Sequence, residues 1–414
     1  MSGAGWKGPA AWARREARAG DRLPYARHLD AATLALRDGS LMQMIRVEGL
    51  PFETEDAEQL DHMLAVRETT LRSVLDARFV VYHHVVRRRV AAALEADFPD
   101  PFCAAVDAAW RARLSATPLF VNEQVLTLVR RPARGKAGWL EWLGRKARGA
   151  AADEARARRE LDSACAALLG ALGGYGARVL GTVVQGGARW SEPLALLSAL
   201  YNGEWRGVAL PDGPGDVQPD LGHHLPYARV SFGLEAIETR RSSGRDFAAM
   251  ISLKDYPDTT RAGMVDALLR LPHELVLTET FAPADRQIAR ERIDLALRRL
   301  KSADEEALAE RAQMHAARDA LGAGSTGFGD HHLSVMVRAE SLPALEGASA
   351  AAMNALADLG AIAVREDVNL EPAFWAQFPG NESYAVRRAL ISTANAAGFL
   401  SLHGFPMGQA QGNH

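Results

Sequence analysis

The chain carries few residues arranged for nucleotide chemistry. A phosphate-binding loop of the form G-x-x-x-x-G-K-[ST] holds phosphates and magnesium with backbone amides, a lysine and a hydroxyl. The sequence has one Gly-Lys pair, Gly135-Lys136, and Ala137 follows it in place of the hydroxyl residue. A G-x-G-x-x-G pattern occurs at Gly322, Gly324 and Gly327, but it follows a predicted helix and precedes a predicted strand, the reverse of the dinucleotide-binding order. We therefore expect a connector there, and no ATP hydrolysis by this chain.

Other residues that could do chemistry are also scattered. Histidines form three adjacent pairs, His83-His84, His223-His224 and His331-His332. Neighbouring residues of a strand point to opposite faces, so such a pair does not make a bidentate metal site. Asp255 and Asp258 lie around a proline, which favours a turn and a helix cap over an acid/base couple. We predict no catalytic residues, no metal and no cofactor.

Composition describes an ordinary soluble chain. The 414 residues are 48% hydrophobic and 24% charged, which fits two or three domains, and the net charge of −3 gives no global argument for nucleic acid. Two cysteines, Cys103 and Cys165, exclude a disulfide framework and suit a reducing cytoplasm. We predict that both are buried. No secretory signal or run of eighteen apolar residues occurs, so we expect neither export nor a membrane span.

A repeated pentapeptide indicates a duplicated unit. LPYAR occurs at Leu23 to Arg27 and again at Leu225 to Arg229. Each copy precedes a predicted hairpin, one turning at Asp38-Gly39 and the other at Ser243-Gly244. Helical and strand-like runs then follow in the same order, including FVVYHHVV from residue 79 and ELVLTETF from residue 274. Each unit closes on a Glu-Pro that opens a helix, in SEPLALLSALYNGE and LEPAFWAQFPGNE.

These landmarks predict an α+β, or mixed α/β, fold of two tandem sheet-and-helix units. The stretch 206–224 is dense in glycine and proline and marks the boundary between them. The predicted division is a basic leader (1–22), a first unit (23–205), a second unit (206–378) and a tail (379–414). Two interpretations of the leader stay open, a frayed end and a basic arm.

Each unit holds an insertion. The first, residues 131–150, mixes tryptophans with arginines and lysines, the composition of a segment at a membrane interface. The candidate contact residues for a membrane or a partner are Trp139, Trp142, Arg145, Lys146 and Arg148. A solvated loop, or tryptophans that dock on a neighbouring subunit, is the alternative. The second insertion, residues 283–321, predicts a helix or a helical hairpin, either available to a partner subunit or packed on its own domain.

From about Leu23 to His414 the chain resembles the N-terminal portion of the VirB/TrbE/CagE conjugal-transfer ATPases of type IV secretion systems. The resemblance rests on the opening hairpin, on ISLKDYPDTT at Ile251 to Thr260, and on a set of residues in the closing segment. That set comprises Phe374-Trp375, Pro379-Gly380-Asn381, Arg387-Arg388, Thr393, Asn395 and Leu402-His403. In that family the tail leads into a motor domain with the phosphate loop, which this sequence does not reach.

The resemblance implies a scaffold on the cytoplasmic face of the bacterial inner membrane. Such a scaffold would join the motor to membrane subunits and help several copies to assemble, while ATP and magnesium would bind in the motor. It implies no catalytic residues in this chain. Two rival hypotheses remain, a small-molecule enzyme in a cleft between the units, and a nucleic-acid-binding module that uses the basic insertion.

Overall fold

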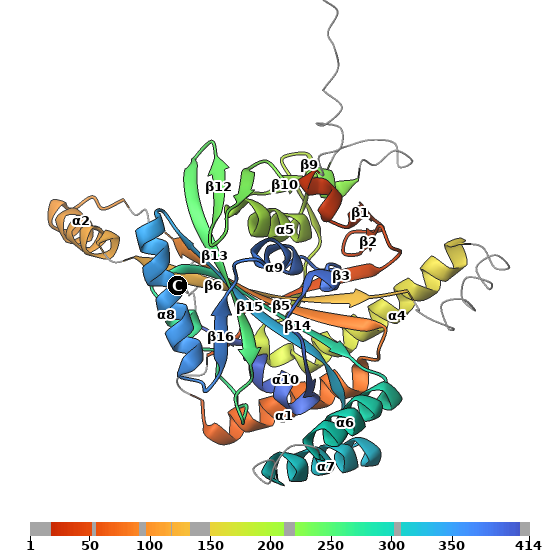
Figure 1. Ribbon diagram of the computed structural model, residues 1–414. Coiled ribbons are helices and arrows are strands. Elements are labelled where there is room, and N and C mark those ends of the chain that lie inside the picture. The colour runs from red at the N-terminus through yellow and green to blue at the C-terminus, as the bar shows by residue number, and fades with distance from the viewer. Residues whose placement is uncertain are drawn as a thin grey trace, which may run out of the picture.

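The computed structural model (Figure 1) is a mixed α+β fold built on one large antiparallel sheet. It describes residues 18–51, 55–90, 97–116, 118–132, 150–210, 220–301 and 308–405. Ten strands run in the order β1-β2-β3-β6-β5-β14-β15-β13-β12-β11, and β7, β16 and β17 pair with β3, β13 and β15. The fold class predicted from the sequence is therefore confirmed.

The two halves of the sheet repeat the same arrangement in opposite directions. The first half comprises β1 (Tyr25–His28), β2 (Leu34–Leu36), β3 (Leu41–Val47), β5 (Phe79–Val90), β6 (Leu119–Arg130) and β7 (Arg178–Val179). The second comprises β11 (Arg229–Phe232), β12 (Ile237–Arg241), β13 (Gly244–Asp255), β14 (Glu274–Pro283), β15 (Phe328–Ala339), β16 (Ile362–Arg365) and β17 (Ala389–Ser392). Each of β1, β2, β3, β6, β5 and β7 has its counterpart in β11, β12, β13, β15, β14 and β16, which confirms the duplicated unit.

Strand register locates the symmetry between the halves. Phe79 at the start of β5 faces Arg130 at the end of β6, and Glu274 at the start of β14 faces Arg338 near the end of β15. Val81 and Val85 of β5 enter the same core as Leu277 and Phe281 of β14, so the two central strands correspond with Val81 at Leu277 and His83 at Glu279.

A pseudo-two-fold axis passes between β5 and β14. The strands pair His83 with Glu279, and the neighbouring strands place Gln124 beside His83 and His331 beside Glu279. Exchanging the halves thus exchanges His83 with Glu279 and Gln124 with His331. The axis passes through this facing pair, and the two units join in one continuous sheet. The predicted division of the chain near residue 206 stays a prediction.

Helices cover both faces of the sheet. The lower face in Figure 1 carries α1 (Ala57–Val74), α4 (Ala150–Ala171), α8 (Leu342–Ala357) and α10 (Thr393–Phe399). The upper face carries α5 (Glu192–Asn202) and α9 (Leu370–Ala376), each with the predicted Glu-Pro in its first turn. Along β5, Val81 and Val85 enter the lower core while Val80 and Tyr82 enter the upper one. Burial on both faces explains why apolar residues do not alternate with polar ones along the first half of β5.

Several short elements complete the fold. A small sheet contains β8 (Thr182–Gln185), β9 (Ala188–Ser191) and β10 (Val208–Ala209), and β18 (His403–Gly404) pairs in parallel with β4 (Leu50–Pro51). Single 3-10 turns are η1 (Ala19–Arg22), η2 (Gly173–Tyr175), η3 (Leu221–His223), η4 (Leu268–Arg270) and η6 (Glu382–Tyr384). The part of the predicted tail up to residue 405 is folded into the body through β17, α10 and β18.

The helical insertion of the second unit is a hairpin of two helices, α6 (Arg286–Lys301) and α7 (Leu308–Ala323). Its Ile293 and Leu297 are buried with Leu321 of α7 and with Phe328 at the start of β15. In the first unit the corresponding connection holds α2 (Pro101–Ser115). Cys103 lies on α2 and is exposed, so its predicted burial is wrong, whereas Cys165 is buried as predicted. Within the described ranges, no helix is long and apolar enough to cross a membrane.

Candidate functional site

The predicted contact residues cannot be placed. Trp139, Trp142, Arg145, Lys146 and Arg148 all lie in 133–149, outside the described residues. The structure gives only the ends of this insertion, which leaves the sheet after β6 and returns at the start of α4. Contact of these residues with a membrane or a partner therefore stays a prediction.

The junction of the two units holds a buried polar cluster on the pseudo-two-fold axis. Glu279 of β14 accepts from His83 of β5 at 3.2 Å and from His331 of β15 at 3.1 Å. The Tyr256 hydroxyl lies 2.8 Å from the other nitrogen of His331. His83, Glu279 and His331 are at most 3% exposed. Two histidines from different sequence pairs, His83 and His331, thus bind the same carboxylate.

Glu279 stays ionised in this setting. Burial by itself raises the pKa of its carboxyl, but the hydrogen bonds from His331 and His83 outweigh burial and hold that pKa below its usual value. The two imidazoles bind different oxygens of the carboxylate, so the donor atoms do not converge on one point. No metal-binding group of three such residues occurs in the described part of the chain.

The cluster has no room for a substrate. The cavity beside His83 and Glu279 has a volume of about 10 Å³, at the lower limit for one water molecule. A second cavity of about 250 Å³ opens at the edge of the junction. Its Arg292 pairs with Asp330 at 2.7 Å, and its Arg388 donates to the Ala385 carbonyl at 3.0 Å. These charges serve the fold, and we assign no reaction to either cavity.

The polar cluster continues to β18, the last described strand. Gln124 of β6 lies 3.3 Å from His83 and donates its amide to the His403 carbonyl. The His403 ring lies 2.7 Å from Asp266, and Asp266 also accepts from the Ser401 hydroxyl at 3.1 Å. An unbroken chain of polar contacts therefore runs from the centre of the sheet to β18.

The second histidine of each adjacent pair in a strand, His84 and His332, binds a backbone carbonyl on the opposite face of the sheet. His84 donates to the Gln377 carbonyl just after α9 at 2.8 Å, and His332 donates to the Arg387 carbonyl at 2.7 Å. Burial lowers the pKa of both imidazoles to about 4. Both rings are therefore neutral near pH 7. The two histidines of each strand pair thus have separate partners, as expected for neighbours that point to opposite faces.

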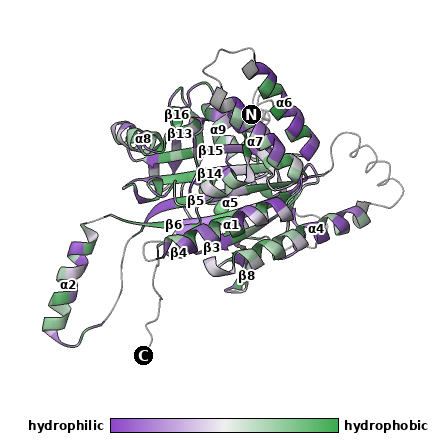
Figure 2. Ribbon diagram, turned by 90° about the horizontal axis from the view of Figure 1, so that it is seen from below, coloured by the Kyte–Doolittle hydropathy of each residue, from purple (hydrophilic) through white to green (hydrophobic). Residues whose placement is uncertain are grey.

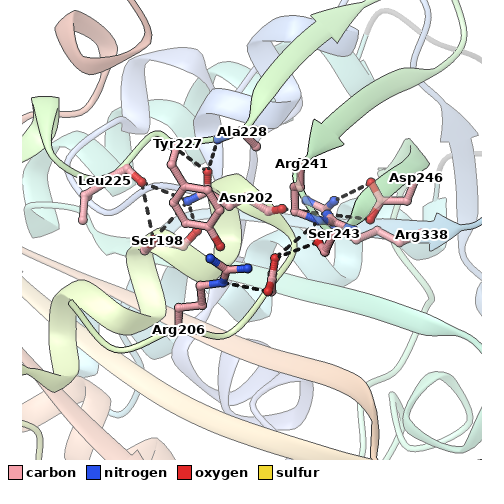
Figure 3. Close-up of polar contacts among 11 residues, drawn as sticks. Ser198, Asn202, Arg206, Leu225, Tyr227, Ala228, Arg241, Ser243, Asp246 and Arg338 are labelled. Atoms are coloured by element: carbon pink, nitrogen blue, oxygen red, sulfur yellow. Dashed lines mark hydrogen bonds and ion pairs between the residues drawn. The ribbon is translucent and has the colours of Figure 1, made fainter.

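An asparagine at the end of α5 binds the second LPYAR segment (Figure 3). Asn202 accepts from the Tyr227 and Ala228 amides at 3.0 and 2.8 Å, and donates to the Leu225 carbonyl at 2.9 Å. It is fully buried. The last helix of the first unit therefore holds the opening segment of the second unit.

An equivalent asparagine of the second unit binds the opening segment of the first unit. Asn381, which follows α9, donates to the Arg22 carbonyl at 2.9 Å, directly before the first LPYAR segment. Gly380 beside it has φ +95°, and a Cβ there would lie 2.4 Å from the Leu36 side chain. Each asparagine stands at the same distance after the Glu-Pro of its unit, a signal in the sequence that could have identified the pair.

Two arginines of the second unit cap the C-terminal end of α5. Arg241 donates to the Asn202 carbonyl at 2.8 Å, and Arg338 donates to the Leu200 carbonyl at 3.3 Å. Asp246 pairs with both, at 2.9 and 3.4 Å (Figure 3). Burial lowers the pKa of Arg338, and the Asp246 charge opposes that effect. Cations are favourable at a helix C-terminus, so this cluster stabilises the contact between the units.

Asn202→Ala should destabilise the whole protein. The change leaves the Tyr227 and Ala228 amides without their acceptor and removes the nearer of two donors from the Leu225 carbonyl. We expect a loss of roughly 2–4 kcal/mol in the free energy of unfolding, measured by urea denaturation. Asn354→Ala, at an exposed position of α8, is the matched control and should change little. Equal losses in the two variants would contradict the role given to Asn202.

The stability of the protein should fall in mild acid because of His84 and His332. Their folded-state pKa is lowered to about 4, so in mild acid these histidines bind protons in the unfolded chain but not in the folded one. Their contribution is complete above about pH 6.5 and is lost as the pH falls to about 4, at up to about 1.4 kcal/mol per pH unit for each histidine.

Urea denaturation across this pH range measures the effect. The double variant His84→Gln, His332→Gln should show a shallower dependence of stability on pH than the wild type. His62→Gln, at an exposed position of α1, is the control and should keep the wild-type slope. An unchanged slope in the double variant would show that these two histidines do not titrate as described.

Comparison with known proteins gives the family. Residues 178–387 match the model of the CagE, TrbE, VirB family, component of type IV transporter system. Residues 32–137 match the N-terminal domain of the type IV secretion system ATPase VirB4/TrbE. These two matches lie on both sides of the pseudo-two-fold axis.

Curated relatives extend the match along the chain. The type IV secretion system protein virB4 of Bartonella henselae is 32% identical over 97% of this chain and 51% of its own length. Protein virB4 of Agrobacterium tumefaciens is 30% identical over 94% of this chain and 49% of its own. The type IV secretion system protein PtlC of Bordetella pertussis is 30% identical over 98% and 49%. The chain spans about half the length of the curated relatives it matches, and it belongs to the CagE, TrbE, VirB family of type IV transporter components.

Proposed function

We propose that this chain is the N-terminal docking scaffold of a type IV secretion ATPase. In this role it links the motor to membrane subunits of the secretion machine at the cytoplasmic face of the inner membrane, and it helps several copies to assemble. The observation that carries the proposal is the match of nearly the whole chain to about half of each type IV secretion relative. The match of residues 32–137 to an N-terminal domain supports the proposal that the chain corresponds to the N-terminal half of such an ATPase.

The architecture fits a rigid platform. One sheet passes through both units, each unit holds the opening segment of the other through a buried asparagine, and β18 is anchored against β4 by backbone and side-chain contacts. A platform of this kind transmits force between a motor and its anchor without internal hinge motion, because its units share both hydrophobic cores.

We propose further that the chain by itself hydrolyses no ATP, and that ATP and magnesium act in the other half of the relatives' length. The buried centre at Glu279 offers no space for a nucleotide, since the cavity beside it has about 10 Å³. Purified chain should release no phosphate from magnesium ATP above the level of a mock preparation. Hydrolysis that co-elutes with the chain through successive columns would overturn this part of the proposal.

A membrane-docking role for the insertion predicts binding to anionic lipid. The purified chain should co-sediment with anionic vesicles, and the double variant Trp139→Ala, Trp142→Ala should lose most of that binding, because interfacial tryptophans supply much of the affinity. Trp205→Ala, at a tryptophan 38% exposed elsewhere on the surface, is the matched control. If neither the wild type nor the control binds vesicles, the docking partner is protein and the lipid contact is wrong.

A further inference from the structure

Helix α2 stands apart from the rest of the fold. It begins after Asp100, whose carboxylate accepts from the Phe102 and Cys103 amides, and none of its residues is buried. Phe102, Val106 and Trp110 repeat every four residues and are 76%, 53% and 58% exposed. Figure 2 shows the helix away from the body of the molecule, with hydrophobic and hydrophilic residues interleaved. An apolar stripe of this size is unusual on a free surface and marks an interaction site.

The second unit shows what such a helix packs against. The connection from β5 to β6 carries α2, and the corresponding connection from β14 to β15 carries α6 and α7. On α6, Ala289, Ile293 and Leu297 have the same four-residue spacing, and they are buried with Leu321 of α7. The second unit therefore has a helix pair where the first unit has a single helix.

We propose that α2 pairs antiparallel with α2 of a second copy of this chain. The inference rests on the assembly role proposed above and names the surface that would carry it. Centred on Val106, the antiparallel pair places Phe102 of one copy beside Trp110 of the other. This contact is isologous, so the same patch serves both copies and closes as a dimer.

The charges of α2 favour the antiparallel arrangement. Asp97 lies just before its N-terminal end and Arg113 in its last turn, whereas Asp100 caps the helix and Arg111 pairs with Asp107 within it. Antiparallel pairing brings the acidic end of each helix beside the basic end of the other, whereas parallel pairing would bring like charges together. The segment is thus complementary to itself.

The same charges argue against lipid as the occupant. A helix that lies in a membrane interface carries an excess of lysine and arginine on its polar face. From Asp97 to Arg113 the acids include Asp107, which pairs with Arg111 at 2.6 Å, so no cationic excess remains. A single helix pair is small beside the roughly 1,200–2,000 Å² of a stable interface, so we expect a dimer that dissociates on dilution.

Sedimentation velocity of the intact chain at low and high micromolar concentration tests the pair. The wild type should shift from monomer to dimer, and Trp110→Asp should raise the dissociation constant at least about tenfold, as truncation of a central aromatic does. Val184→Asp, at an apolar residue of β8 that is 75% exposed, is the matched control and should dimerise like the wild type. Because α2 has no buried residues, thermal melts of both variants should match the wild type.

Charge reversal tests the orientation. Arg113→Glu alone should weaken the dimer by roughly two- to tenfold, and adding Asp97→Lys should restore it, because two symmetric ion pairs are broken and then rebuilt with opposite signs. A wild type that stays monomeric, or a Trp110→Asp variant that dimerises normally, would overturn the proposal. So would loss of vesicle binding in Trp110→Asp without any dimer. Vesicle binding and ATP hydrolysis report on the proposed function separately from these results.

Discussion

The structure depends on the antiparallel pairing of β5 with β14 around one buried carboxylate. Glu279 carries its charge in the interior, and such a charge is tolerated only where hydrogen bonds replace those to water. His83 and His331 supply these contacts from the strands on either side of β14. A one-residue slip of β14 would move Glu279 to the opposite face, away from both histidines. The carboxylate therefore fixes the register at which the two units join.

The consequences of that register extend to both ends of the chain. Gln124 relays the polar contacts from His83 to His403, and thereby to the β18–β4 pair. On the other face, His84 reaches the backbone that follows α9, whose neighbour Asn381 binds the segment before the first LPYAR. Contacts that couple distant residues in this way make separate unfolding of one unit costly. We expect the described body to unfold as one cooperative structure.

Sequence reasoning succeeded where the cause was local. The hairpins at Asp38-Gly39 and Ser243-Gly244 and the helices opened by Glu-Pro follow from turn and capping chemistry within a few residues. The sequence did not predict that Glu279 lies between His83 and His331. These residues are far apart in the chain, and only the register of β14 against β5 and β15 brings them together. Cys103 was misassigned because free cysteines are usually buried, whereas α2 buries none of its residues.

The duplication separates what is constrained from what can vary. The shared sheet keeps the same strand order in both halves, since its inner strands are held by neighbours on both sides and by both cores. The connections have diverged: β5 and β6 are linked through α2, while β14 and β15 are linked through a packed pair of helices. A symmetric core can present two different edges in this way. The two units therefore have different surfaces at these connections, so they need not bind the same partner.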